Sequence, residues 1–99
     1  MIIVLGSIVA RPDTLDALRK ASLEHVHRSR MEPGCVSHAV HVDSENPLRL
    51  VFVEKWKDAP ALAAHFKVKG SIDFVGQARA LGAEAPVIEI FEATAARLG

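Results

Sequence analysis

Five histidines are the residues of this 99-residue chain best suited to chemistry near neutral pH, because imidazole changes its charge between about pH 5 and 8. His65 is the first candidate for a general base. It falls three residues after Leu62 and next to Phe66, on the predicted inward face of a helix, where an unpartnered polar ring would be costly. A structural histidine, hydrogen-bonded to a carbonyl group or to Glu54, would give the same pattern.

A carboxylate and two aromatic side chains alternate along a second segment. Phe52, Glu54 and Trp56 are spaced two residues apart, so they share one face of a predicted strand. Glu54 between aromatic rings is either a base with a raised pKa or the residue that orients a histidine. The alternatives are a strand-end Glu54 paired with a lysine, and Trp56 as a core residue instead of a pocket wall.

Two further histidines are candidates for the same site. His25 lies on the shoulder of the first predicted helix, two turns beyond Leu18, so it points either into a pocket or into water. His38 alternates with Val40 along the second predicted strand, where it could bind or deprotonate a substrate hydroxyl. For both, the alternative is a solvated histidine or one at a dimer interface.

The spacing of the histidines does not predict a metal site. His25 and His27 are two residues apart on a helix and diverge, while His38 and His41 fall on opposite faces of a strand. Cys35 is the single cysteine, so a thiolate site is excluded. We expect no bound metal, and we expect His27 and His41 to lie at the surface.

Alternating strand and helix patterns must position these side chains. Asp13 and Asp58 are expected to cap helices, and Gly34 suits the positive φ of a helix exit. We expect strands over 2–10, 35–42, 48–57 and 87–93, a helix from 13 to about 31, and two helices within 58–82. The order β-α-β-β-α-β predicts one α+β domain over residues 1–99 with the ferredoxin-like split β-α-β fold.

The sheet of this fold has one face without helices. On the third predicted strand, Val51 and Val53 point to that face, opposite to Phe52. Burying an apolar sheet face requires another layer, and two copies packed face to face would supply it. We therefore predict a homodimer.

Composition excludes several classes of partner. The 12 basic and 12 acidic residues cancel, so no net field attracts nucleic acid or an anionic membrane. The apolar run at the start of the chain is too short to span a bilayer. A single cysteine fits a reducing compartment, and we expect a cytoplasmic protein.

Several short motifs carry a resemblance to a known family. They are Glu32-Pro33-Gly34-Cys35, Asn46-Pro47, Glu54-Lys55-Trp56 followed by Asp58, and Ala61-Leu62-x-x-His65-Phe66. Over nearly its whole length the chain resembles the antibiotic biosynthesis monooxygenase family, most closely its small quinol-monooxygenase-like members. The resemblance implies a dimeric α+β barrel with a pocket between sheet and helices. In some members it implies oxygenation of phenols or hydroquinones by O2 without metal, flavin or haem.

Such a reaction needs a base near neutral pH and an apolar chamber that admits O2. The resemblance therefore favours His65 or His38 as the base, with His25 and Glu54 as further catalytic candidates. The expected walls are the aromatic side chains of Phe52, Trp56, Phe66 and Phe74. Two family positions differ: Val68-Lys69-Gly70-Ser71 replaces a Thr-Pro-His-Phe step, and His38 stands where a tyrosine is common. These changes bear on the substrate and leave the expected fold intact.

Three alternatives use the same scaffold. One is an isomerase-type enzyme that moves protons without O2, and another is a non-catalytic dimer that binds a small ligand. The third is haem binding, for which related proteins place an asparagine on the first strand and a tryptophan on the helix after the third. Here Gly6 and Ser7 occupy that strand, His65 occupies the helix position, and no histidine follows it.

Overall fold

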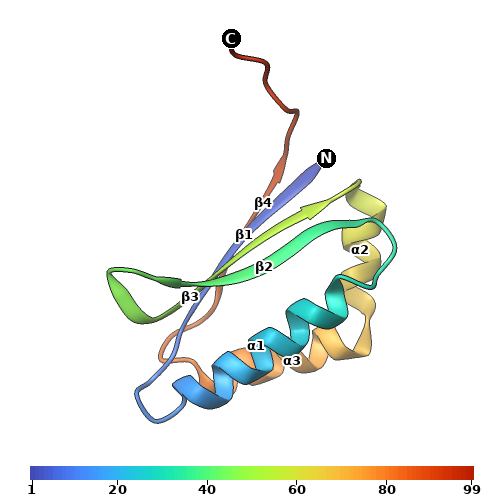
Figure 1. The fold of residues 1–99 in the computed structure, drawn as a ribbon. Helices are drawn as coiled ribbons and strands as arrows, with labels where there is room; N and C mark the ends of the chain where they lie inside the picture. Colours follow the sequence, from blue (N-terminus) through green and yellow to red (C-terminus); the bar gives the residue numbers. More distant parts are fainter.

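The computed structural model describes all residues, 1–99. Strand β1 covers Ile2–Val9, β2 Cys35–Asp43, β3 Asn46–Trp56 and β4 Val87–Glu92; helix α1 covers Leu15–Ser29, α2 Ala59–Lys67 and α3 Lys69–Leu81. The four strands form one antiparallel sheet in the order β2-β3-β1-β4. All three helices lie on one side of this sheet (Figure 1). The predicted ferredoxin-like α+β fold is confirmed.

The start of α1 differs from the prediction. Thr14, not Asp13, occupies the N-cap position, and its hydroxyl donates to the carbonyl oxygen of Leu81 at 2.6 Å instead of capping the helix. Asp13 pairs with Arg11 at the surface. Thr14 therefore ties the beginning of α1 to the end of α3, a long-range contact that helix-cap statistics do not reveal.

The exit from α1 and the entry to α2 follow the prediction. Gly34 has a φ of 83°, and a Cβ there would lie 2.5 Å from the Cβ of Ala61. Asp58 caps α2 by accepting a hydrogen bond from the Ala61 backbone N–H at 2.9 Å. The two turns thus pack against each other and fix α2 beside the end of β3. Helix α3 begins at Lys69, two residues earlier than expected from Ser71.

The sheet register places the polar candidates in one row. Glu54 on β3 pairs with His38 on β2 and with Val4 on β1. Since paired residues point to the same face, Glu54 and His38 both face the helices, together with Phe52 and Trp56.

Two apolar clusters form the interior, and the buried histidines lie between them. The larger cluster includes Ile8, Leu18, Val26, Leu50, Phe52 and Phe74. The smaller consists of Ile2, Val4, Trp56 and Leu62. His25 contacts Phe52 and Phe74, whereas His38 and His65 contact Trp56. A polar centre thus interrupts the core where α1, α2 and the sheet meet.

The opposite face of the sheet carries apolar side chains without a covering layer. Leu5, Val87 and Phe91 are exposed there, and Val51 and Val53 are partly buried, on the face that the sequence predicted. None of the three helices combines the length and the apolar character needed to cross a membrane.

Candidate active site between the helices and the sheet

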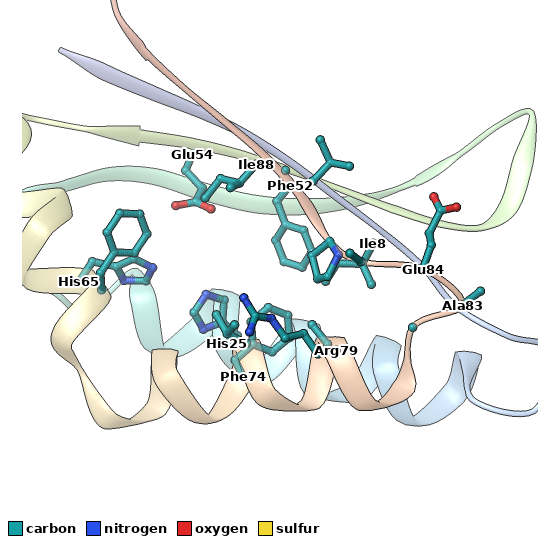
Figure 2. A pocket seen from close by; sticks show the side chains of 18 residues that line it. Ile8, His25, Phe52, Glu54, His65, Phe74, Arg79, Ala83, Glu84 and Ile88 are labelled. Carbon is teal, nitrogen blue, oxygen red and sulfur yellow. The ribbon is translucent and has the colours of Figure 1, made fainter.

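A cavity of about 590 Å³ lies between α3 and the sheet. This volume is within the range of small-molecule sites. Figure 2 shows His65 and Glu54 at one end of it, Ala83 and Glu84 at the other, and Arg79 between them. Six of the eight predicted site residues line it: His25, Phe52, Glu54, His65, Phe66 and Phe74.

The other two predicted site residues lie behind this wall. His38 and Trp56 are almost completely buried, at 2% and 0% exposure, and do not border the cavity. Other side chains separate His38 and Trp56 from the cavity. His38 therefore reaches a bound molecule only through Glu54, His25 or His65, unless side chains move.

His65 is held by a carboxylate. Its Nδ1 lies 2.9 Å from Oε1 of Glu32, while Ser71 Oγ is farther from the same nitrogen, at 3.4 Å. An ionised carboxylate can only accept, so Nδ1 of His65 carries the proton and Nε2 keeps its lone pair. Both side chains are nearly buried. This geometry is that of a histidine base oriented by an acid.

His25 has the opposite kind of partner. Its Nδ1 lies 2.7 Å from a guanidinium nitrogen of Arg28, and its ring stacks on Phe74 with centroids 4.2 Å apart. Burial lowers the pKa of His25 to about 3, and His38, His65 and Arg28 add to this effect. His25 is therefore a neutral ring at physiological pH and is unsuited to act as a base there.

Glu54 is an anion held by its neighbours. Its Oε1 accepts from the indole N–H of Trp56 at 3.0 Å and lies 3.2 Å from Nε2 of His38. The His38 contact has ion-pair distance without hydrogen-bond alignment, because neither His38 nitrogen has a hydrogen-bond partner. Burial would raise the pKa of Glu54, but contacts with His38 and Trp56 outweigh it and lower the pKa. Of the two alternatives drawn from the sequence, this favours Glu54 as the partner of a histidine over Glu54 as a base with a raised pKa.

Three histidines from different elements meet at this centre. His25 on α1, His38 on β2 and His65 on α2 each place a ring nitrogen within 4.8 Å of the other two. Their ring centroids are 5.3 to 5.7 Å apart. Sequence spacing did not indicate this cluster, because it compares only near neighbours along the chain. His27 and His41 lie at the surface, as predicted.

Two residues that contact the buried histidines were not predicted as site residues. Glu32 was named only as part of a turn motif, and Arg28 was not named. A carboxylate and an arginine near histidines in the sequence are only a weak indication of such contacts. Their positions along the chain do not show which ring nitrogen each of them contacts. Cys35 lies nearby as a free thiol, and burial, with Glu32 and Glu54, raises its pKa and so keeps it protonated.

Comparison with known proteins agrees with this architecture. Residues 1–76 match the family model described as antibiotic biosynthesis monooxygenase. An uncharacterized protein of Synechocystis, sll1783, is 31% identical over 91 residues, which are 92% of this chain and 62% of that protein. The chain thus spans less than two thirds of the length of this curated relative.

Solved structures share the whole fold. A crystal structure of an antibiotic biosynthesis monooxygenase is 25% identical with a TM-score of 0.88, covering 96% of this chain and 100% of that one. PA3566 from Pseudomonas aeruginosa is 26% identical with a TM-score of 0.84, covering 95% and 94%. Rv0793 from Mycobacterium tuberculosis is 21% identical with a TM-score of 0.89, covering 96% of each chain. By its sequence match and its fold, this chain belongs to the antibiotic biosynthesis monooxygenase family.

Proposed function

We propose that this protein is a cofactor-independent monooxygenase that oxidises a small phenol or hydroquinone with O2. The observation that carries the proposal is the His65–Glu32 pair, in which Nδ1 is 2.9 Å from a carboxylate oxygen at the wall of an apolar cavity. Family membership supports the reaction class. The substrate and the identity of the base are our proposal.

The first step is removal of the hydroxyl proton. O2 has a triplet ground state and reacts slowly with closed-shell molecules, so the substrate must first become electron-rich. Nε2 of His65 takes the phenol proton, and Glu32 stabilises the resulting imidazolium through Nδ1–H. Glu54 adds a second negative charge near the same ring, since its contacts keep it ionised.

The second step is the reaction of the phenolate with O2. One electron passes to O2, and the superoxide and phenoxyl radical combine at a ring carbon that bears hydrogen to give a peroxide anion. This anion takes the phenol proton held by His65 and becomes a hydroperoxide. Nε2 of His65 then removes the hydrogen on that ring carbon as a proton, cleavage of the O–O bond yields a quinone and hydroxide, and the hydroxide takes this second proton from His65 to become water. The balance is one phenol and one O2 to one quinone and one water.

The rest of the cavity serves to hold the ring and exclude water. Phe52, Phe66 and Phe74 provide apolar walls. The neutral His25 ring lies on Phe74. Its Nε2–H, the ring nitrogen that does not contact Arg28, is available as a donor to a peroxide or phenolate oxygen. Such donors stabilise developing negative charge.

Oxygen uptake with a panel of hydroquinones and naphthols tests the proposal. The protein is treated with a chelator, and ¹⁸O2 labelling follows one oxygen atom into the quinone and one into water. His65→Asn should abolish uptake, while His27→Asn, at an exposed site on α1, serves as the matched control and should leave it unchanged. Unlabelled quinone, or full uptake by His65→Asn, would overturn the proposal.

An isomerase would use the same pair without O2. It predicts exchange of deuterium from solvent into a carbonyl compound, dependent on His65 and insensitive to the removal of oxygen. A non-catalytic binding module predicts saturable binding of aromatics without either reaction. Either result in place of labelled quinone would replace the monooxygenase proposal.

We propose further that the protein acts as a homodimer. The exposed apolar residues Leu5, Val87 and Phe91 lie on the helix-free face of the sheet, and a second copy would cover them. Light scattering should give twice the 10.7 kDa chain mass, and Leu5→Lys should shift the protein toward the monomer. The exposed Leu23→Lys on α1 is the matched control. A monomeric wild-type protein would contradict the proposal.

A further inference from the structure

The three-histidine cluster has most of the features of a metal site. Ring nitrogens bound to zinc at about 2.0–2.1 Å lie about 3.4 Å apart in tetrahedral geometry. His25, His38 and His65 already place one nitrogen each within 4.8 Å of the others. The carboxylate of Glu32 on Nδ1 of His65 is also the usual support of a metal-bound histidine.

Arg28 makes this cluster unsuitable for a metal. A guanidinium group has only donors, so its contact with His25 requires the lone pair on Nδ1. A neutral imidazole has one lone pair and one N–H, and therefore Nε2 carries the proton. Binding a cation through Nδ1 would displace the Arg28 guanidinium, and binding it through Nε2 would require an imidazolate next to Arg28 or the loss of the Arg28 contact.

The position of Arg28 is built into the fold. Its guanidinium occupies the space beside Gly70 on α3, where a Cβ would lie 2.5 Å from Cζ and 2.8 Å from Cδ of Arg28. Its Nε is buried without a hydrogen-bond partner. The arginine thus gives up solvent contacts to reach His25, and the absence of a side chain at position 70 makes room for it.

We propose that Arg28 is a positioning residue that fixes His25 as the Nε2–H tautomer. It thereby keeps the three-histidine cluster free of divalent metal ions and turns a donor toward the cavity. The role of that donor in catalysis rests on the proposed function, whereas the tautomer and the metal exclusion do not.

Nitrogen-15 NMR of the histidine rings tests the tautomer directly. In the wild-type protein at neutral pH, the proton of His25 should be on Nε2. In Arg28→Met, which removes the donor, the ring should show a mixture of tautomers or Nδ1–H. Arg19→Met, at an exposed position of the same helix, should leave the His25 signals unchanged. A His25 that carries its proton on Nδ1 in the wild-type protein would overturn the proposal.

Titration with Co²⁺ tests the exclusion, since its visible bands report bound nitrogen ligands. Wild-type protein should show no bands from a histidine site, and Arg28→Met should bind Co²⁺ at least about 10–100-fold more tightly, the usual size of an outer-shell effect. Adding His25→Ala to that variant should abolish the gain. Tight binding by the wild-type protein, or no gain in Arg28→Met, would contradict the proposal.

Gly70→Ala provides a second test, in which the arginine at position 28 is retained but its guanidinium group is expected to move. The added Cβ should displace the guanidinium, so this variant should shift toward the tautomer mixture and the Co²⁺ affinity of Arg28→Met. Circular dichroism verifies that both variants fold. Neither the tautomer nor the Co²⁺ affinity requires turnover, so a failed oxygen-uptake experiment would not contradict this inference. Likewise, a failure of the NMR or Co²⁺ experiment would not contradict the proposed oxygenation.

Discussion

Two histidines in one cavity have opposite partners. His65 on α2 presents Nδ1 to the carboxylate of Glu32 at 2.9 Å, and His25 on α1 presents Nδ1 to the guanidinium of Arg28 at 2.7 Å. Their rings are 5.3 Å apart and both are buried. Burial and residue type are thus the same, and only the partner differs.

The partner decides which proton each ring can move. A carboxylate makes Nδ1 a donor, leaves a lone pair on Nε2 and stabilises the imidazolium. A guanidinium makes Nδ1 an acceptor and opposes a further positive charge. The end of the cavity at His65 is therefore suited to accept a proton from a substrate, and the His25 side to donate a hydrogen bond.

The largest expected effect comes from removing the proposed base. His65→Asn should lower kcat/KM for oxygen uptake by about 10²–10⁴-fold, the usual contribution of a general base. His25→Gln, which retains an amide donor, should cost much less. Steady-state kinetics on both variants measure the contrast, and equal losses would show that the two rings are not distinct.

Removing the negative charge of Glu32, the partner of His65, should have the next largest effect on activity. Glu32→Gln keeps the size of the side chain and removes the negative charge beside the imidazolium. Hydrogen bonds to charged groups are worth about 1.5–3 kcal/mol, so kcat/KM should fall by about 10–100-fold. The exposed Glu24→Gln on α1 is the control, and a Glu32→Gln variant as active as wild type would remove the reason for assigning the base to His65.

The stability of the protein should report the low pKa of His25. Its folded pKa is about 3 against 6.5 for the free side chain, so between these values only the unfolded chain binds the proton. The free energy of unfolding therefore decreases as pH falls through that window. From about pH 7 to pH 5, wild type should lose roughly 2 kcal/mol more than His25→Gln in urea titrations. An equal loss would contradict a neutral His25.

A smaller effect should come from the stack beneath His25. The ring lies 4.2 Å from Phe74 with an interplanar angle of 9°, and such pairs contribute about 0.5–1.5 kcal/mol beyond area burial. A double-mutant cycle with Phe74→Leu and His25→Gln should yield a coupling of that size. Additive effects would show that Phe74 does not hold the ring.

Much of the fold follows from local patterns in the sequence. The alternation around Phe52, Glu54 and Trp56 and the turn at Gly34 depend on neighbours along the chain, and they were predicted. The cap of α1 was not, because the Thr14 hydroxyl binds Leu81, which is 67 residues away. Periodicity carries no information about such pairs.

The sequence predicted most of the residues that line the site, but it did not predict which side chains contact each other there. The cavity walls at Phe52, Phe66 and Phe74 were predicted from the aromatic character of these residues together with the family resemblance. The partners of the histidines were not, because Glu32 reaches His65 across 33 positions, and the spacing of His25 and Arg28 on one helix does not show which ring nitrogen the guanidinium reaches. The proton states depend on these partners, so they required the structure.

Nitrogen-15 NMR of both rings in one spectrum tests the central claim most directly. At a pH where both rings are neutral, His65 should carry its proton on Nδ1 and His25 should carry it on Nε2. The exposed His27 and His41 supply reference signals without buried partners. Opposite tautomers at His65 and His25 are the predicted result, and the same tautomer at both would contradict the assignment of base and donor to these two residues.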